Sequence, residues 1–247
     1  MSNIWDMIRV VLFGSHNDAS RDGAPAFIPA QDIPLMAGKV ILLTGAAAIE
    51  LARYGRPSRI YIADLPRSDD AKQDLIRQIN YEAYRDPISI SPHHGDGQCA
   101  QKFAAQEQHL DILILNAGII RGHISAPKEG VDFDLVKTNC SNLPYPKSYG
   151  QCKAALIGLM KGLSRDCPQI KTVAIHPGRI PTGMATSLWK ESSTLTKPIA
   201  PFFCVLVTIG IRNHLWAATS LKVVIGTYYE PVGVPGRLED QTFADRL

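Results

Sequence analysis

The sequence of 247 residues lacks the features that mark several classes of protein. It has no Cys-x-x-Cys pair, and its five cysteines are odd in number, which favours a reducing compartment over a disulfide framework. It has no basic run interleaved with aromatic residues, and a net charge of +3 is too small to indicate nucleic acid. The apolar run 199–211 is shorter than the roughly 20 residues that span a bilayer. We therefore expect a cytoplasmic protein with no transmembrane span and no nucleic-acid partner.

The sequence has no internal repeat and no low-complexity segment, and we expect that its N-terminus is not a secretory signal. Met1 to Phe13 has acidic and basic residues inside its apolar stretch, which fits a packing arm better than a membrane-surface anchor. Residues 14–37 are rich in Gly, Ser, Asn, Asp and Pro and carry no periodic pattern. We predict an N-terminal arm over 1–37 and one domain over 38–247.

Short apolar runs alternate with helical patterns along that domain. The predicted strands are 39–43, 59–63, 87–90, 110–115, 171–175 and a last one within 222–229. The predicted helices are 46–54, 68–84, 99–109, 131–139 and 149–165. This alternation predicts an α/β fold, a doubly wound parallel sheet of the Rossmann type, in which ligands bind at the carboxyl ends of the strands. The strand 110–115 is apolar enough that we expect it to be buried on both faces.

Tyr149 and Lys153 are the strongest chemical signal in the sequence. On a helix, residues four apart project from the same face. A lysine ammonium beside a phenol favours the phenolate and lowers the pKa of the tyrosine from its usual value of about 10. The pair can therefore transfer protons near neutral pH, although by itself an exposed helix face explains the spacing equally well.

Polar and glycine-containing turns follow the predicted strands at four places. These are Thr44-Gly45, Asp64, Asn116-Ala117-Gly118 and Pro177-Gly178, the last with Thr182 shortly after it. Together with Tyr149 and Lys153, this order resembles the short-chain dehydrogenase/reductase family from about residue 38 to residue 229. The stretches 215–219 and 226–231 look like the retinol-dehydrogenase-like reductases common in fungi.

The resemblance implies a role for each matching residue. Tyr149 would exchange a proton with the substrate oxygen, Lys153 would tune the tyrosine and hold the nicotinamide ribose, and Asn139 would position a water in the proton relay. A helix C-terminal position explains Asn139 equally well. The implied cofactor-binding residues are Thr44, Gly45, Asp64, Asn116, Ala117, Gly118, Tyr149, Lys153, Pro177, Gly178 and Thr182.

The residue after the second strand bears on the choice of cofactor. A carboxylate there, as in Asp64, accepts hydrogen bonds from the adenosine ribose and repels a 2′-phosphate. Arg67 could instead attract that phosphate. We therefore expect NAD or NADP, with NAD slightly favoured; a simple turn before Pro66 remains the alternative role of Asp64.

Two units of the family pattern are absent. The family's first loop has two further glycines, whereas here Thr44-Gly45 runs directly into Ala46-Ala47-Ala48. The strand that carries the family's catalytic serine should precede Tyr149, but residues 140–148 hold two prolines and no apolar run. Ser141 and Ser148 are the nearest hydroxyls. We hypothesise that the chain carries two internal deletions and that the sheet is incomplete at one interior strand.

Two functions compete on this sequence. The first is an oxidoreductase acting on a small carbonyl or alcohol, with residues 182–213 as a substrate lid whose apolar residues suggest a lipophilic substrate. The alternative is a non-catalytic relative that keeps only the fold and its oligomerisation surfaces. The apolar face of helix 149–165 makes a homo-oligomer possible under either reading. A metal site would rest only on His93, His94 and Asp96, so we expect no metal.

Overall fold

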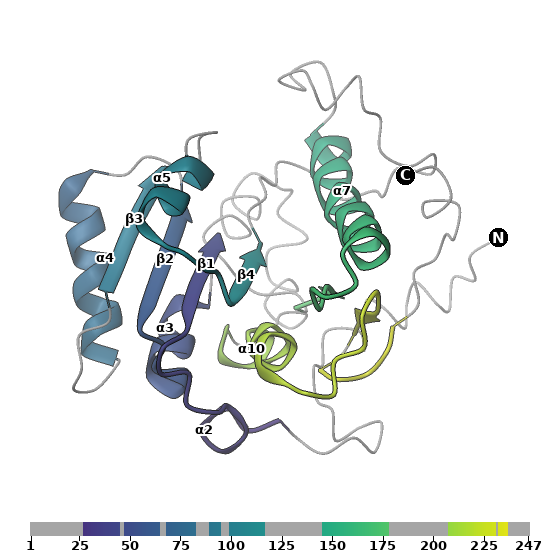
Figure 1. The fold of residues 1–247 in the computed structure, drawn as a ribbon, viewed down its shortest axis with the longest axis horizontal. Coiled ribbons are helices and arrows are strands. Elements are labelled where there is room, and N and C mark those ends of the chain that lie inside the picture. The colour runs from purple at the N-terminus through teal and green to yellow at the C-terminus, as the bar shows by residue number, and fades with distance from the viewer. Residues whose placement is uncertain are drawn as a thin grey trace, which may run out of the picture. The chain divides into compact units, whose positions relative to one another are not determined.

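The structure is a computed structural model, and it divides the chain into two compact units (Figure 1). The sheet unit comprises Phe27–Ala117 and His214–Ser220. The α7 unit comprises Met1–Ala26, Gly118–Asn213 and Leu221–Leu247. The structure describes residues 27–44, 47–64, 68–82, 89–94, 99–116, 145–177, 207–230 and 232–236.

A four-stranded parallel sheet forms the centre of the sheet unit. Its strands are β1 (Val40–Thr44), β2 (Arg59–Asp64), β3 (Ser89–His94) and β4 (Ile112–Leu115). They lie in the order β3-β2-β1-β4, and each pairs in parallel with its neighbour (Figure 1). The predicted α/β fold with a parallel sheet is confirmed.

The two central strands are buried because their side chains are apolar on both faces. Ile41 and Leu43 of β1 and Ile60 of β2 are fully buried on one face, where the register pairs Ile41 with Ile60. On the other face, Val40 and Tyr61 form a buried cluster with Phe103. Such continuous burial is typical of strands covered by helices on both sides.

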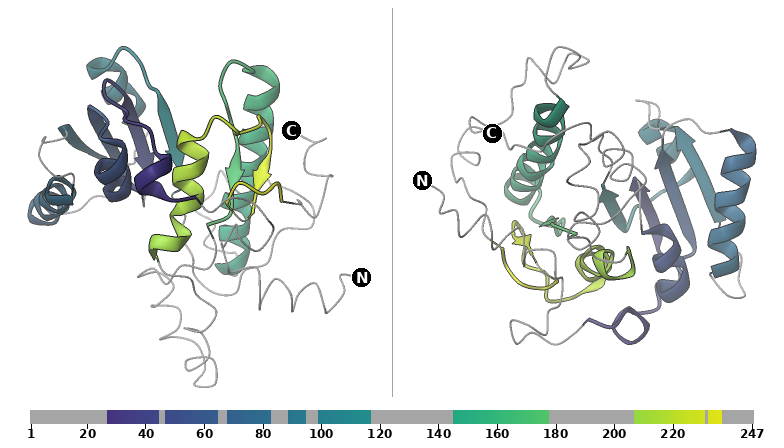
Figure 2. Two further views of the ribbon diagram at one scale, coloured as in Figure 1. Left: turned by 90° about the horizontal axis from the view of Figure 1, so that it is seen from below. Right: turned by 180° about the vertical axis from the view of Figure 1, so that it is seen from behind.

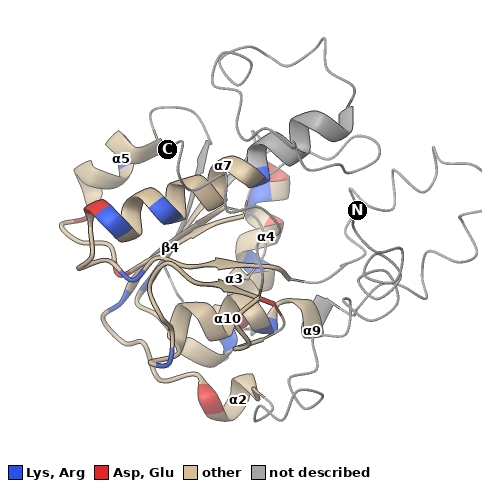
Figure 3. Cartoon of the chain, turned by 90° about the vertical axis from the view of Figure 1, so that its right-hand side faces the viewer, with Lys and Arg blue, Asp and Glu red and all other residues tan. Residues whose placement is uncertain are grey.

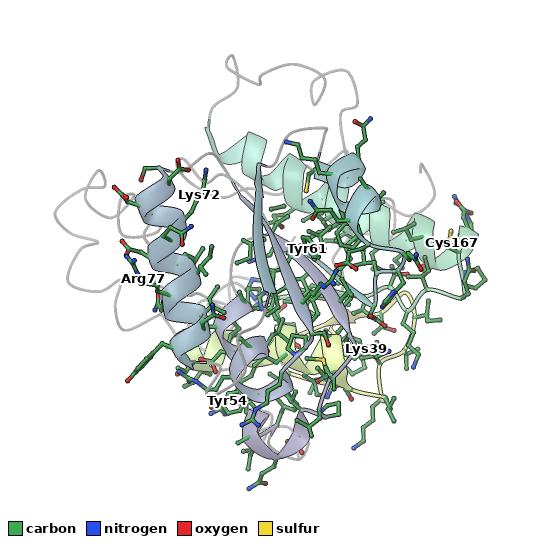
Figure 4. All side chains as sticks on the ribbon, turned by 60° about the vertical axis from the view of Figure 1, so that its left-hand side comes forward. Lys39, Tyr54, Tyr61, Lys72, Arg77 and Cys167 are labelled. Atoms are coloured by element: carbon green, nitrogen blue, oxygen red, sulfur yellow. The ribbon has the colours of Figure 1, made fainter. Side chains whose placement is uncertain are left out.

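Helices α4 (Asp69–Glu82) and α5 (Cys99–Gln106) lie on opposite sides of the sheet (Figure 2). The ring of Phe103 on α5 packs edge to face on Tyr61, with the ring centroids 5.0 Å apart. The Tyr61 hydroxyl donates to Glu107 Oε1 at 2.6 Å, and Arg59 Nη1 donates to the same oxygen at 2.5 Å. Tyr61 thus lies among the side chains packed on the sheet, whereas Arg77 extends from α4 (Figure 4).

Strand β3 contains a proline, which its position in the sheet explains. Pro92 lies opposite Ile62 in the register with β2. Proline has no N–H to donate and is confined to edge strands. Since β2 is the strand that pairs with β3 among the described residues, the proline leaves that ladder in place.

The prediction that residues 110–115 are buried on both faces is wrong. Leu113 and Leu115 are 49% and 42% exposed, whereas Ile112 and Ile114 are half-buried. The exposed leucines lie on the face of the sheet where Phe103 of α5 covers Tyr61. Phe103 packs on Val40 of β1 and Tyr61 of β2, so it leaves the leucines of β4 exposed. The predicted helix 131–139 lies outside the described residues.

The described part of the predicted N-terminal arm belongs to the sheet unit. Residues 27–37 contain the short helix α2 (Pro29–Asp32), and Phe27, Ile33 and Met36 are buried. The Met36 N–H donates to the Gly55 carbonyl at 2.7 Å. These contacts join residues 27–37 to the segment between β1 and β2.

The α7 unit is organised by one long helix and a pair of short strands. Helix α7 (Tyr145–Asp166) begins four residues before the predicted 149–165, with a proline in its first turn, where no intrahelical N–H is needed. Strands β5 (Ala174–Ile175) and β6 (Tyr228–Tyr229) pair in parallel. Helix α9 (Val207–Gly210) precedes α10 (Arg212–Thr219), which begins in this unit and continues in the sheet unit. Of the helices that the structure describes, none is both long and apolar enough to cross a membrane.

The absence of one interior strand from the sheet stays a prediction. Residues 145–148, inside the expected gap, form the first turn of α7 rather than a strand. In the described residues, β4 pairs with β1 and β5 pairs with β6. Residues 117–144 lie outside the described part of the chain.

Ala47, in the connection after β1, has a left-handed backbone although it is not glycine. Ala47 has φ 101° and ψ −13°, and it is buried at the start of α3 (Ala48–Glu50), which continues as a π-helical turn, η2 (Leu51–Gly55). A left-handed backbone costs an L-residue roughly 1–2 kcal/mol, a penalty that glycine avoids. The predicted helix 46–54 is therefore a short α-helical start followed by a wider turn.

We predict that Ala47→Gly is tolerated or stabilising. Relief of the left-handed strain offsets the lost methyl burial and the extra backbone entropy, so the free energy of unfolding should change by about 0 to +1 kcal/mol. The matched control is Ala48→Gly, one residue later in α3, which should lose about 1–2 kcal/mol. Urea unfolding measures both; an Ala47→Gly variant as destabilised as the control would contradict a strained turn.

Asp111 joins the amino ends of β1 and β4. Its Oδ1 accepts a hydrogen bond from Lys39 Nζ at 2.8 Å, and its Oδ2 accepts one from the Val40 N–H at 2.8 Å. Its own N–H donates to the Val40 carbonyl at 3.0 Å. The hydrogen bond from Lys39, followed by that from Val40, lowers the pKa of the Asp111 carboxyl.

We predict that Asp111→Asn lowers the free energy of unfolding by about 1–2 kcal/mol at pH 7, because an amide cannot serve both donors as a carboxylate does. Because the pKa of Asp111 is lowered in the folded state, its ionised carboxyl group stabilises the fold above the ordinary carboxyl pKa of about 4. This stabilisation is lost as the pH falls through the pKa of Asp111 in the folded state. The difference between the variant and the wild type should therefore shrink between about pH 5 and pH 3.

Urea unfolding across this pH range provides the measurement for Asp111. Asp74→Asn is the control, since it removes an exposed ion pair with Arg77 on α4 that contributes about 0–0.5 kcal/mol. A wild-type advantage over Asp111→Asn that stays constant down to pH 3 would show that the carboxylate charge is not what stabilises this edge.

Candidate functional site

Thr44 ties the carboxyl ends of β1 and β4 together. Its hydroxyl accepts a hydrogen bond from the Asn116 N–H at 2.8 Å and donates to the Ile114 carbonyl at 3.4 Å. The threonine thereby fixes the backbone at the point where the chain leaves β4. Thr44 and Asn116, far apart in the sequence, are therefore in direct contact.

Asp64 lies at the same edge of the sheet, at the end of β2. In the register, Thr44 lies opposite Ala63, and Asp64 lies opposite His94 of β3. The structure describes the backbone of Asp64 but not its side chain. Its position at the carboxyl edge of β2 agrees with the sequence analysis, and its ribose contact stays a prediction.

Tyr149 and Lys153 both lie on α7, one helical turn apart. The lysine is half-buried, and the described side chains of α7 include further cations at Lys161 and Arg165, the latter paired with Asp166 (Figure 3). The side chain of Tyr149 is outside the described part. The helix required by the Tyr-Lys spacing is therefore present, and the pair belongs to the α7 unit.

Pro177 lies two residues after the end of β5, and the sequence predicted the same strand end at Ile175. The preceding residue, His176, has its Nδ1 3.5 Å from Glu230 Oε1, and the other oxygen of Glu230 accepts a hydrogen bond from the Tyr228 hydroxyl at 2.7 Å. Burial, reinforced by the negative charge of Glu230, raises the pKa of Tyr228. Tyr228 is therefore a neutral hydrogen-bond donor that orients Glu230 towards His176.

Two of these residues, Tyr228 and Glu230, were missed as functional candidates by the sequence analysis. The only signal was the stretch 226–231, which resembled a family segment without indicating a contact. His176 was interpreted as structural, which is consistent with its ion-pair geometry with Glu230.

The remaining predicted site residues lie outside the described part of the chain. They are Gly45, Ala117, Gly118, Asn139, Gly178 and Thr182. The predicted lid 182–213 is described from residue 207 onwards, where α9 and the start of α10 lie. The described site residues fall in both units: Thr44, Asp64 and Asn116 in the sheet unit, and Tyr149, Lys153 and Pro177 in the α7 unit.

The described residues contain no group of three His, Cys, Asp or Glu side chains that could hold a metal ion. The side chains of His93 and His94 are not among those described, although both residues lie on β3. What the described geometry offers instead is polar and backbone hydrogen-bonding groups at strand ends and a lysine on a helix.

Comparisons with known sequences find an oxidoreductase and a dehydrogenase. No family model matches the chain. An uncharacterized oxidoreductase of Schizosaccharomyces pombe is 32% identical over 116 residues, which cover 42% of this chain and 33% of that protein. Human retinol dehydrogenase 13 is 24% identical over 272 aligned positions, which cover 85% of this chain and 82% of the relative. The first of these matches thus spans only about a third of the relative's length.

Solved structures agree in fold. A short-chain dehydrogenase from Shigella flexneri superposes with a TM-score of 0.57 at 19% identity and covers 86% of this chain and 98% of its own. A short-chain dehydrogenase/reductase from Burkholderia xenovorans gives a TM-score of 0.55 at 15% identity, with the same coverages of 86% and 98%. At these identities the likeness shows the fold. Taken with the sequence relatives, it supports a member of the short-chain dehydrogenase/reductase family.

Proposed function

We infer that the chain is an NAD(P)-dependent oxidoreductase that interconverts a carbonyl and a primary or secondary alcohol on a small, lipophilic substrate. The observation that supports this most is the position of Tyr149 and Lys153 one turn apart on α7, immediately before a strand that leads into Pro177. The oxidoreductase relative named above points to the same class of reaction.

The residues at the carboxyl edge of the sheet fit a dinucleotide. Thr44 holds the Asn116 backbone, Asp64 ends the adjacent strand, and a helical segment begins at Ala48 with no side-chain cap on its first backbone amides. Uncapped amides at a helix start favour a negatively charged group such as a pyrophosphate. Thr44, Gly45, Asn116, Ala117 and Gly118 would line the backbone side of this site.

In the proposed mechanism, Tyr149 transfers the proton and Lys153 supports it. The phenol donates a proton to the carbonyl oxygen during reduction or accepts one from the alcohol during oxidation. The ammonium of Lys153 favours the phenolate and donates a hydrogen bond to the ribose. When bound, the nicotinamide gives or takes the hydride. Asn139 would hold a water that replenishes the proton on Tyr149, and Ser141 and Ser148 are the nearest hydroxyls for orienting the substrate.

The substrate class is inferred from a relative and from the composition of the proposed lid. One relative carries the name retinol dehydrogenase, and retinol is an apolar alcohol. The large apolar residues between residues 182 and 213 include Met184, Leu188, Trp189, Phe202, Phe203 and Val205. An apolar lid of this kind would exclude water from the reacting atoms and favour a lipophilic aldehyde, ketone or alcohol.

We predict that NADH raises the melting temperature more than NADPH does at equal concentration, because Asp64 would accept hydrogen bonds from the ribose and repel a 2′-phosphate. A ligand at 100 times its dissociation constant adds about 2.7 kcal/mol to the stability of the folded state. A thermal-shift titration with each cofactor measures this. A larger shift with NADPH would assign the dominant contact to Arg67 instead.

We predict that Tyr149→Phe lowers the turnover of an apolar aldehyde by about 10²-fold or more, because the phenol is the proton donor. Binding of NADH should remain, since the substitution removes only the hydroxyl. NADH oxidation followed by absorbance measures the rate. Tyr145→Phe, at the first residue of the same helix, is the matched control and should leave the rate unchanged. Turnover by Tyr149→Phe at the rate of Tyr145→Phe would contradict Tyr149 as the proton donor, and no turnover by the wild type would favour the non-catalytic relative.

A further inference from the structure

Asn213 is fully buried where β5 and β6 end. Its Nδ2 donates one hydrogen bond to the His176 carbonyl at 2.9 Å and another to the Tyr229 carbonyl at 3.0 Å. Because both neighbours are carbonyl oxygens, which only accept hydrogen bonds, the NH₂ group of the amide must face them. The Oδ1 atom is buried with no hydrogen-bond partner among the described residues, so the side chain's contribution lies in its two donors.

The His176 carbonyl accepts a hydrogen bond from a side chain outside the ladder of β5 and β6. The His176 N–H donates to the Tyr229 carbonyl at 3.0 Å, as the parallel register requires. Asn213, at the start of α10, donates to the His176 carbonyl from a different element.

This carbonyl precedes the segment expected to bind the nicotinamide. Pro177 has no N–H and restricts the residue before it to an extended conformation, so the direction of the chain beyond His176 depends on how that residue is held. Asn213 contacts His176 through its carbonyl, and Glu230 contacts it through the imidazole. Of these, Asn213 is the buried one that also binds β6.

We propose that Asn213 is a positioning residue for the nicotinamide half of the cofactor, because its two donors fix the strand exit that leads into Pro177-Gly178. The inference rests on the proposed function. Asn213 touches neither the cofactor nor the substrate and acts through the His176 carbonyl. Its loss should therefore weaken binding of the nicotinamide portion and spare the adenosine portion.

The test compares NADH with ADP-ribose, which lacks the nicotinamide, by calorimetric titration of the full chain. For Asn213→Ala, we expect the affinity for NADH to fall about tenfold while the affinity for ADP-ribose stays within about twofold of wild type. The control is Asn80→Ala, the same substitution at an asparagine on α4 whose Oδ1 is also buried without a partner. Asn80→Ala should leave the affinities for NADH and for ADP-ribose unchanged.

Three results would overturn the proposal. Equal losses for both ligands in Asn213→Ala would make Asn213 merely structural, and unchanged affinities would remove its role altogether. A wild-type chain that binds neither ligand would overturn the proposed function and, with it, this inference. If the wild type binds both ligands and Asn213→Ala binds them equally well, only this inference is overturned. If Asn213→Ala fails to melt cooperatively, Asn213→Ser, which keeps one donor, takes its place and should lose NADH affinity selectively.

Discussion

The pairing of β1 with β4, fixed by a side chain at each end, is the constraint on which the sheet unit depends. At the amino edge Asp111 bonds to both Lys39 and the Val40 backbone, and at the carboxyl edge Thr44 bonds to the Asn116 backbone. Both contacts join residues about 70 positions apart, so each offsets a large loop-closure entropy once the strands are paired. The amino edge serves stability, and the carboxyl edge places the backbone where a dinucleotide would bind.

The loop after β1 shows how this chain departs from its family while keeping the topology. The turn that glycine usually makes is made by Ala47 in a left-handed conformation. Strain of this kind persists only where the surrounding structure imposes it, and here the buried strand before it and the buried Leu51 after it do so. A left-handed alanine at this position therefore costs stability, while a helix still follows β1.

Most of the sheet unit could be predicted from the sequence because local signals coincide there. Strands β1 and β2 are apolar runs bounded by turn residues, and α4 and α5 follow clear helical patterns. The exposure of Leu113 and Leu115 could not be predicted, because it depends on which helix covers that part of the face. Nor could Asn213, whose partners are backbone carbonyls 37 and 16 residues away and leave no pattern in the sequence.

Amide hydrogen exchange of the full chain, measured with and without NADH, tests the central claim most directly. That claim is that the carboxyl edge of the sheet still binds a dinucleotide although the loop glycines are missing. We expect slower exchange in peptides containing Thr44, Asn116 and residues 174–177, with no change at the amino edge around Lys39 and Asp111. Unchanged exchange at the carboxyl edge in saturating NADH, or protection confined to the amino edge, would contradict the account.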